Sequence, residues 1–338
     1  MIDRRVTVVG AGAIGGYVAA KLAAAGVPVD VCDRNSEHVE AIRRHGLRVS
    51  GAADLLQRID AVHPDELEGG LEIVLLAVKT GGTGSALDAI APHLAADGFV
   101  VSLQNGLQEY EIAERLGPER TIGGFLTFGG HYVRPGELAF GGPGSLKVGE
   151  LDGRLTDRAE ELASLLSIAH VAQATRNIFG FLWAKTAILA FYFASALSGT
   201  DVQDLIQDLA LRPALDALVA EVVDVAAAEG VTPEVVDGFD PAAFRRRDAE
   251  AMNASWRAQL RYWDGHESRR TGIWRDLAVH QRLTEVEGIL VPVLARGRRH
   301  GIPTPLLELT VEMTRAAEAR QRELGMANVE ELARACPV

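Results

Sequence analysis

The sequence of 338 residues has little cysteine and little positive charge. Its two cysteines, Cys32 and Cys336, offer neither a disulfide framework nor the spacing of a metal site, so we expect no bound metal and a reducing compartment. The net charge of −12 argues against a nucleic-acid-binding surface, and short arginine runs such as 245–247 are interpreted as solvated faces. No signal peptide precedes the strand-like segment Val6–Val9, which favours the cytoplasm.

Long hydrophobic runs are also scarce. The segment from Ile178 to Leu197 is nearly all apolar and about as long as a membrane span. It is solitary, lies in the middle of the chain and contains Lys185, a residue that would be costly in lipid. We therefore predict a buried helix and no membrane partner.

The first half of the chain alternates strand and helix signals. Short β-branched runs such as Val6–Val9 and Val27–Cys32 are separated by amphipathic stretches such as Ala13–Ala25. The unbroken apolar run Ile73–Val78 is typical of a central parallel strand that is buried on both faces. This alternation predicts a doubly wound parallel sheet, and the glycine-punctuated segment 129–149 is expected to extend it with antiparallel strands.

The second half has a different pattern. Strand signals vanish after about Arg176, and long helical patterns follow to the end of the chain. We therefore predict an α/β protein with two domains. The first, residues 1–174, is a Rossmann dinucleotide-binding domain, and the second, residues 175–330, is all-helical and carries substrate-binding and catalytic residues.

The dinucleotide assignment depends on Gly10-Ala11-Gly12-Ala13-Ile14-Gly15, which lies between a predicted strand and a predicted helix. In this motif the first glycine allows a tight turn, the second lets the pyrophosphate approach the backbone, and the third lets the helix pack closely. Asp33 follows at a suitable distance to hold the adenosine ribose, which favours NAD. Arg34 comes directly after it and suits a 2′-phosphate, which favours NADP.

Two further polar residues follow predicted strands. Lys79 comes directly after Ile73–Val78, and Asn105 follows the next strand. Ligands in open α/β sheets bind at the carboxyl ends of the strands, so both residues are candidate cofactor ligands. A solvated loop lysine and a turn asparagine before Gly106 are the alternatives.

Several of these motifs together resemble the ketopantoate reductase (2-dehydropantoate 2-reductase) family. The resemblance runs from about residue 5 to 310, in order and at compatible spacing. It is carried by the glycine motif, by Ala77-Val78-Lys79, Leu103-Gln104-Asn105-Gly106, Trp183-Ala184-Lys185 and Thr284-Glu285-Val286-Glu287, and by His300-Gly301-Ile302-Pro303-Thr304-Pro305.

The resemblance implies NADPH-dependent reduction of a 2-keto acid, with Lys185 as the general acid. It also implies that Lys79, Asn105 and Glu285 bind the cofactor and that Asn105 and Lys185 contact the substrate. Without the family pattern, Glu285 would be interpreted as a surface residue. The chemistry supports Lys185 independently, because desolvation in an apolar helix should lower its pKa toward a useful range. A lysine that reaches solvent at the helix edge, or one paired with Glu285, is the alternative.

The sequence departs from the family at the substrate side. The family has asparagines four and eight residues after the lysine, whereas Leu189 and Phe193 occupy these positions here. We expect both to form an apolar wall on the stripe of Lys185. The family's later serine falls on about Thr271 or Gly272. An aromatic-rich segment nearby either packs in the core or lines the pocket, and it contains Trp256, Tyr262, Trp263, His266 and Trp274.

These departures favour a bulkier or more apolar keto or imino substrate over ketopantoate, because lost asparagines would leave substrate hydroxyls unpaired. A non-catalytic dinucleotide-binding sensor with the same fold is the alternative from another class, and the retained Lys185 and Glu285 argue against it. The apolar helical domain favours a homodimer.

Overall fold

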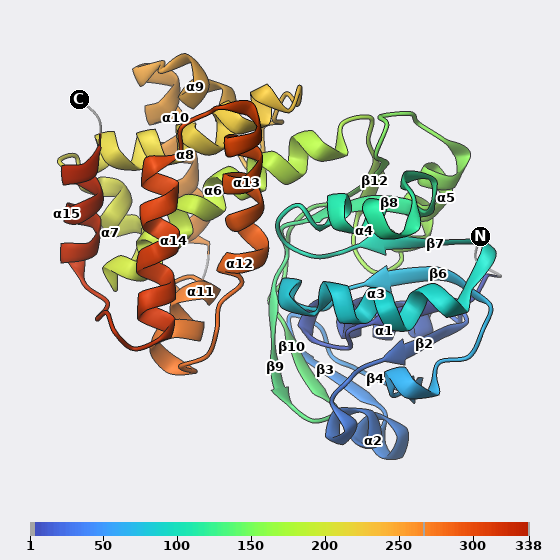
Figure 1. Ribbon diagram of the computed structural model, residues 1–338. Helices are drawn as coiled ribbons and strands as arrows, with labels where there is room; N and C mark the ends of the chain where they lie inside the picture. Colours follow the sequence, from blue (N-terminus) through green and yellow to red (C-terminus); the bar gives the residue numbers. More distant parts are fainter. Residues whose placement is uncertain (1–3, 266–267, 337–338) are drawn as a thin grey trace. The chain divides into compact units, whose positions relative to one another are not determined.

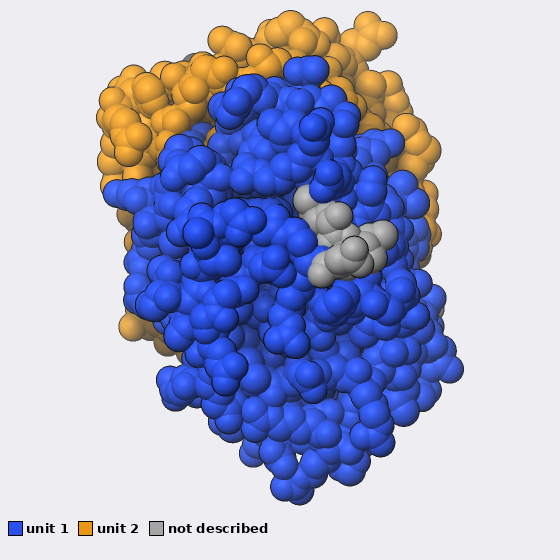
Figure 2. All heavy atoms as spheres, turned by 90° about the vertical axis from the view of Figure 1, so that its right-hand side faces the viewer, with its two compact units in different colours: residues 1–178 blue, residues 179–338 orange. Residues whose placement is uncertain are grey.

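The computed structural model describes residues 4–265 and 268–336. The chain divides into two compact units, Met1–Ile178 and Phe179–Val338, which Figure 2 shows in different colours. The predicted boundary after residue 174 falls at the end of strand β12 (Ala172–Ala174), before helix α6 (Ile178–Ser198) begins. The last helix, α15 (Met326–Ala335), continues past the predicted end of the second domain at residue 330.

The first unit contains the strands and five of the helices (Figure 1). Besides β12, its strands are β1 (Val6–Val9), β2 (Val29–Cys32), β3 (Leu47–Gly51), β4 (Leu55–Gln57), β5 (Asp60–Val62), β6 (Leu71–Leu76), β7 (Leu94–Ser102), β8 (Thr121–Leu126), β9 (Gly130–Arg134), β10 (Glu137–Phe140) and β11 (Leu146–Glu150). Its helices are α1 (Ala13–Ala24), α2 (Ser36–His45), α3 (Thr83–Ile90), α4 (Gln108–Leu116) and α5 (Asp157–Leu166).

The main sheet has the order β12-β11-β8-β7-β6-β1-β2-β5. Every neighbouring pair from β8 to β5 is parallel, whereas β11 pairs antiparallel with β8 and β12 pairs parallel with β11. The chain starts at β1, moves to β2 on one side and then returns to β6 on the other. This reversal creates the crevice in which doubly wound folds bind ligands, so the predicted α/β architecture is confirmed.

Both faces of this sheet are buried, as the apolar runs predict. In β6, Ile73 and Leu75 belong to one core, which also includes side chains of α1 and α5. The alternating residues Val74 and Leu76 belong to a second core with side chains of α3 and α4. Successive side chains of a strand point to opposite faces, so one continuous apolar run fills two cores.

The glycine-rich segment 129–149 is only partly what the sequence predicts. β11 does extend the main sheet in the antiparallel direction, but β9 and β10 do not belong to it. They form a separate sheet with order β4-β3-β10-β9, in which β10 pairs in parallel with β3 (Figure 1). The expectation was wrong here because short strands carry weak patterns, and their partners lie far away in the sequence.

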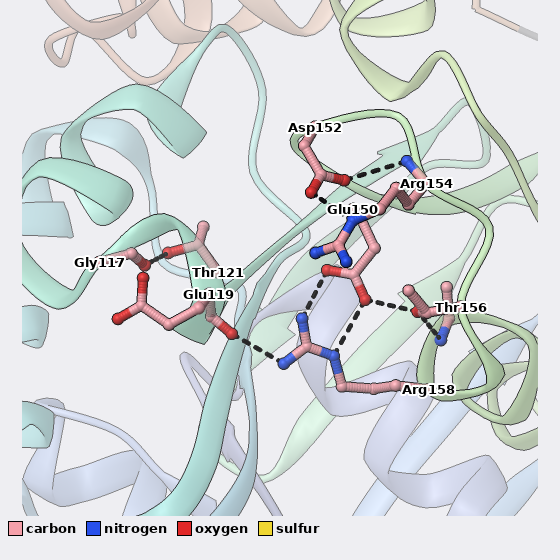
Figure 3. A network of polar contacts seen from close by, with 9 residues as sticks. Gly117, Glu119, Thr121, Glu150, Asp152, Arg154, Thr156 and Arg158 are labelled. Carbon is pink, nitrogen blue, oxygen red and sulfur yellow. Dashed lines mark hydrogen bonds and ion pairs between the residues drawn. The ribbon is translucent and has the colours of Figure 1, made fainter.

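A polar network joins α5 to the sheet (Figure 3). Glu150 ends β11 and is almost fully buried, and its Oε1 accepts hydrogen bonds from Thr156 Oγ1 at 2.6 Å and Arg158 Nε at 3.0 Å. Thr156 also caps α5, and Arg158 donates to the backbone oxygen of Glu119, before β8. A buried carboxylate is tolerated here because hydrogen bonds and an ion pair compensate its lost hydration.

The second unit is helical in its described residues, apart from a short bridge between Val236 and Phe239, which confirms the predicted class. Besides α6 and α15, its helices are α7 (Val202–Gln207), α8 (Arg212–Ala228), α9 (Pro241–Arg246), α10 (Ala249–Asp264), α11 (Gly272–Trp274), α12 (Val286–Ile289), α13 (Val291–His300) and α14 (Pro305–Glu318), and a π-helical turn covers Arg275–Val279. The central helix is α8, because α9, α13, α14 and α15 all pack against it.

Helix α6 is the apolar run that resembles a membrane span. By length and composition it qualifies as one, but 72% of its most apolar 18-residue window is buried inside the fold. This burial agrees with the prediction of a buried core helix, which was made because Lys185 would be costly in lipid.

Candidate functional site

In the first unit, the predicted cofactor residues lie along one edge of the main sheet. The loops that contain Gly10, Asp33, Lys79 and Asn105 follow β1, β2, β6 and β7, and these four strands are adjacent and parallel. The carboxyl ends of parallel strands share one edge. The structure therefore brings these sequence-distant residues together at the topological switch point.

The three motif glycines have different surroundings. Gly10 has a φ of +98°, and a Cβ there would lie 2.7 Å from the backbone nitrogen of Val78. A Cβ on Gly15 would lie 2.2 Å from the Gly10 oxygen, so this position serves the packing of α1 on the sheet. A Cβ on Gly12 would meet nothing within 4 Å. Gly12 is thus the motif glycine with open space, as a ligand-facing position requires.

The N-terminus of α1 has the features of a phosphate site. Its N-cap, Gly12, provides no capping side chain, and the first turn has no acidic residue. The next helix, α2, is instead capped by Asn35 Oδ1, which accepts from the backbone nitrogens of Glu37 and His38. The first amides of an uncapped helix need acceptors, and an anion can supply them. These residues therefore fit a dinucleotide pyrophosphate.

The carboxylate of Asp33 is engaged by the backbone. Its Oδ2 accepts from Ala11 N at 2.8 Å, and its Oδ1 accepts from Asn35 N at 2.9 Å. Arg34 is exposed and makes no ion pair with any residue in 4–265 or 268–336. Of the two residues, Asp33 is tied to the glycine loop, and the guanidinium of Arg34 is available to an anionic ligand.

Lys79 and Asn105 lie on neighbouring loops that a polar network joins. Gln104 Nε2 donates to the Val78 oxygen at 2.9 Å and to Thr83 Oγ1 at 2.8 Å. This network is buried and fixes the loop after β7 against the loop after β6. Lys79 is exposed, and the half-buried side-chain amide of Asn105 has no hydrogen-bond partner among the described residues.

In the second unit, Lys185 is half-buried on a face of α6 that is not fully covered. Leu189 and Tyr192 are the partly exposed residues that follow it, whereas Phe193 is 0% exposed. An α-helix turns about 100° per residue, so position 193 is rotated by about 80° from Lys185 and position 192 by only about 20°. The expectation that Phe193 belongs to the wall beside Lys185 was therefore wrong, and Tyr192 takes its place.

Tyr192 is fixed by the aromatic-rich helix α10. Its hydroxyl donates to Gln259 Oε1 at 2.8 Å and accepts from Trp263 Nε1 at 3.0 Å, and the two rings form an edge contact at 5.5 Å. Burial raises the pKa of Tyr192, so the phenol stays protonated. Because these two bonds engage the hydroxyl, the face beyond Lys185 presents mainly apolar surface.

The other aromatic residues differ in burial. Trp256 is a core residue whose ring centre lies 4.7 Å from that of Phe191, and its Nε1 donates a hydrogen bond to Asp216 Oδ1. Trp274 is half-buried, and the guanidinium of Arg270 lies 4.4 Å from its ring centre. Tyr262 is half-buried, with its ring centre 6.1 Å from that of Trp263, and His266 lies outside the described residues.

Two predicted site residues lie at helix starts. Thr271 is almost fully buried, and its hydroxyl caps α11 by accepting from Trp274 N at 3.1 Å. Glu285 is half-buried at the N-cap of α12, where its backbone oxygen accepts from Ile289 N. Their roles toward cofactor and substrate stay predictions.

Sequence reasoning missed three residues of these sites. Gly16 faces β10, where a Cβ would lie 2.3 Å from Leu138 Cδ1, and only the fourth glycine of the run signals this. Tyr192 lies seven residues after Lys185, a spacing that a helical projection reveals. The third is His38, which follows the helix cap Asn35 and whose ring contacts the backbone of Ala11 and of Gly136, two segments distant from it in the sequence.

Comparisons with known proteins agree on one family. The family model described as "Ketopantoate reductase PanE/ApbA" matches residues 6–153, and "Ketopantoate reductase PanE/ApbA C terminal" matches residues 177–318. The 2-dehydropantoate 2-reductase of Halobacterium salinarum is 28% identical over 321 residues, covering 93% of this chain and 99% of that protein.

Two solved structures share the fold of this chain. A PanE/ApbA family ketopantoate reductase from Ralstonia eutropha JMP134 is 27% identical with a TM-score of 0.77, covering 94% of this chain and 99% of that one. A D-mandelate dehydrogenase with NADH and anilino(oxo)acetate has a TM-score of 0.79 at 22% identity, with the same coverage.

Proposed function

The chain belongs to the ketopantoate reductase family, and we propose that it reduces a 2-keto acid to the 2-hydroxy acid. A reduced nicotinamide, when bound, supplies the hydride for the keto carbon. The observation that carries the proposal is Lys185, which is half-buried on a partly exposed face of a largely apolar helix. From there its Nζ can donate a proton to the carbonyl oxygen as that atom gains negative charge.

We propose that the cofactor is NADPH. The pyrophosphate would bind at the open N-terminus of α1, next to Gly12, and Lys79 and Asn105 would contact the cofactor from the neighbouring loops. The exposed guanidinium of Arg34 would pair with the 2′-phosphate. Because both oxygens of Asp33 already accept backbone hydrogen bonds, this carboxylate is less available to a ribose diol. NADH, the cofactor in the D-mandelate dehydrogenase structure, is the alternative.

We propose that the substrate is bulkier or more apolar than ketopantoate. The support comes from Leu189 and Tyr192, which offer no free amide on the face of Lys185. Hydroxyl groups placed against this face would lose hydrogen bonds to water without gaining protein partners. Thr271 and Glu285 are assigned to substrate and cofactor by the family pattern alone, and so is the contact of Asn105 with the substrate.

The experiment is NADPH oxidation by the purified chain with a panel of 2-keto acids that includes ketopantoate and larger, apolar members. We expect turnover with formation of the 2-hydroxy acid and a higher kcat/KM for the apolar members. Cofactor binding without turnover on any keto or imino compound would instead identify a sensor.

We also propose that the chain is cytoplasmic and forms a homodimer. Its low cysteine content, two residues in 338, supports a reducing compartment. Large apolar side chains exposed on the second unit, namely Leu209, Val235, Val279 and Leu283, support an interface between two copies. Sedimentation equilibrium of the native chain would test the assembly.

A further inference from the structure

A buried histidine lies directly beneath the dinucleotide loop. His38 on α2 is 1% exposed, and its Nε2 lies 2.9 Å from the backbone oxygen of Ala11. Its Nδ1 accepts a hydrogen bond from the backbone nitrogen of Gly136 at 2.9 Å. Gly136 occupies the turn between β9 and β10 with a φ of +78°, after Pro135, as in a type II turn. The ring thus joins the glycine loop to the second sheet.

The hydrogen bonds define the state of the ring. A backbone N–H can only donate, so Nδ1 must be the unprotonated nitrogen. The proton is then on Nε2, which donates to the Ala11 oxygen. Both ring nitrogens are used, which explains how a polar ring is accommodated in this buried position.

Ala11 is consequently held on both sides. Its N–H donates to Asp33 Oδ2 at 2.8 Å, and its carbonyl oxygen accepts from His38. The next residue, Gly12, faces the open space at the start of α1. The support beneath is rigid, because Leu138 of β10 packs against Gly16 so closely that a Cβ there would lie 2.3 Å away.

We propose that His38 is a positioning residue for the cofactor, one that holds the Ala11 carbonyl and thereby presets the phosphate-binding backbone at Gly12. The proposal rests on the dinucleotide binding proposed above. His38 itself does not contact the cofactor. It lowers the entropy that the loop loses when the pyrophosphate binds, because the backbone is already in its bound conformation. The second sheet, through Gly136, is the platform that holds the ring in place.

Two variants each keep one half of this bridge. Because Gln Nε2 can replace the donor toward Ala11, His38→Gln keeps the bond to the loop. Because Asn Oδ1 can replace the acceptor for Gly136 N–H, His38→Asn keeps only the bond to the hairpin. A matched control is His170→Asn, since His170 Nε2 lies 2.9 Å from the Gly144 oxygen, another ring contact to a backbone carbonyl in the same unit.

The readouts are the Kd of NADPH, kcat at saturating NADPH, and Tm. We expect His38→Asn to raise the Kd about three- to tenfold, as loss of one hydrogen bond predicts, with kcat nearly unchanged. His38→Gln should stay within about twofold of the wild type, and so should His170→Asn.

An unchanged Kd of NADPH in His38→Asn would overturn the proposal. It would also be overturned if His38→Asn and His38→Gln lost the same amount of affinity and the same amount of Tm, because that result would indicate a role in folding only. If the wild-type chain bound neither NADPH nor NADH, the proposed function itself would fail, and this inference with it. Normal binding by the wild type with no difference between the two variants would refute the inference alone.

Discussion

The dinucleotide loop and the face of α6 around Lys185 are built by opposite means. The loop presents backbone amides, and its side chains are absent or small, so its chemistry depends on where Gly10, Gly12 and Gly15 allow the chain to pass. The face of α6 presents side chains from a regular helix, and its chemistry depends on which residues point outward. Substitution of a glycine in the loop should therefore impair either folding or cofactor binding. On the helix face, in contrast, single substitutions can change substrate specificity.

The sharpest test of this contrast is Lys185→Ala. Loss of the proton donor should lower kcat by about 10²- to 10⁴-fold, the usual contribution of a general acid, while the Kd of NADPH stays within about twofold. Stopped-flow NADPH oxidation and cofactor fluorescence measure the two quantities. Lys147→Ala on β11 is the matched control and should leave both unchanged. A mutant that lost cofactor affinity but kept kcat would break the division between the two regions.

In the loop, the largest effect should come from Gly12→Val. The structure has room for the side chain, so the fold should survive, but the valine would fill the space proposed for the pyrophosphate. Overpacking of about 1–3 kcal/mol corresponds to a loss of affinity of up to about 100-fold. Gly15→Ala provides the comparison, because its Cβ would collide with the Gly10 oxygen and should lower Tm instead. Calorimetric titration and thermal melting separate the two results, and equal affinity in Gly12→Val would contradict this placement.

On α6, Leu189 and Phe193 should behave differently although both replace family asparagines. Leu189→Asn should raise kcat/KM for ketopantoate relative to apolar 2-keto acids by about tenfold, since one substrate hydroxyl regains a partner. Phe193→Asn should leave this ratio unchanged and destabilise the fold by about 3–5 kcal/mol, because its side chain is fully buried. A change of specificity in Phe193→Asn would mean that position 193 does reach the substrate.

An effect of similar size concerns cofactor choice. Arg34→Ala should weaken NADPH by about tenfold and leave NADH nearly unaffected, because a charge-assisted hydrogen bond to the 2′-phosphate is lost. Arg44→Ala, which removes an exposed arginine of α2 that pairs with Glu40, serves as the control. If both cofactors respond alike to Arg34→Ala, or if Asp33→Ala improves NADPH binding, NADH becomes the better assignment.

The same contrast explains what could be predicted from the sequence. The glycine loop, Lys79 and Asn105 could be found because each follows a strand whose apolar run is a local signal. The second sheet could not, since β10 pairs with β3 from a distant part of the chain. His38 was missed for the same reason, because its two partners, Ala11 and Gly136, come from elements on either side of it in the sequence.

On α6 the error was geometric. Steps of four residues were treated as one straight stripe, but each step drifts by about 40°, and two of them carried Phe193 into the core.

The central claim is that this chain transfers hydride from a nicotinamide to the keto carbon of a 2-keto acid. The most direct measurement is a turnover with NADPH carrying deuterium at C4 of the nicotinamide, on the transferred face, followed by mass spectrometry of the product. The account predicts a 2-hydroxy acid with one deuterium at C2, formed in equal amount to the NADP⁺, and almost none with Lys185→Ala. Consumption of NADPH without deuterium at C2, or no consumption with any 2-keto acid, would contradict it.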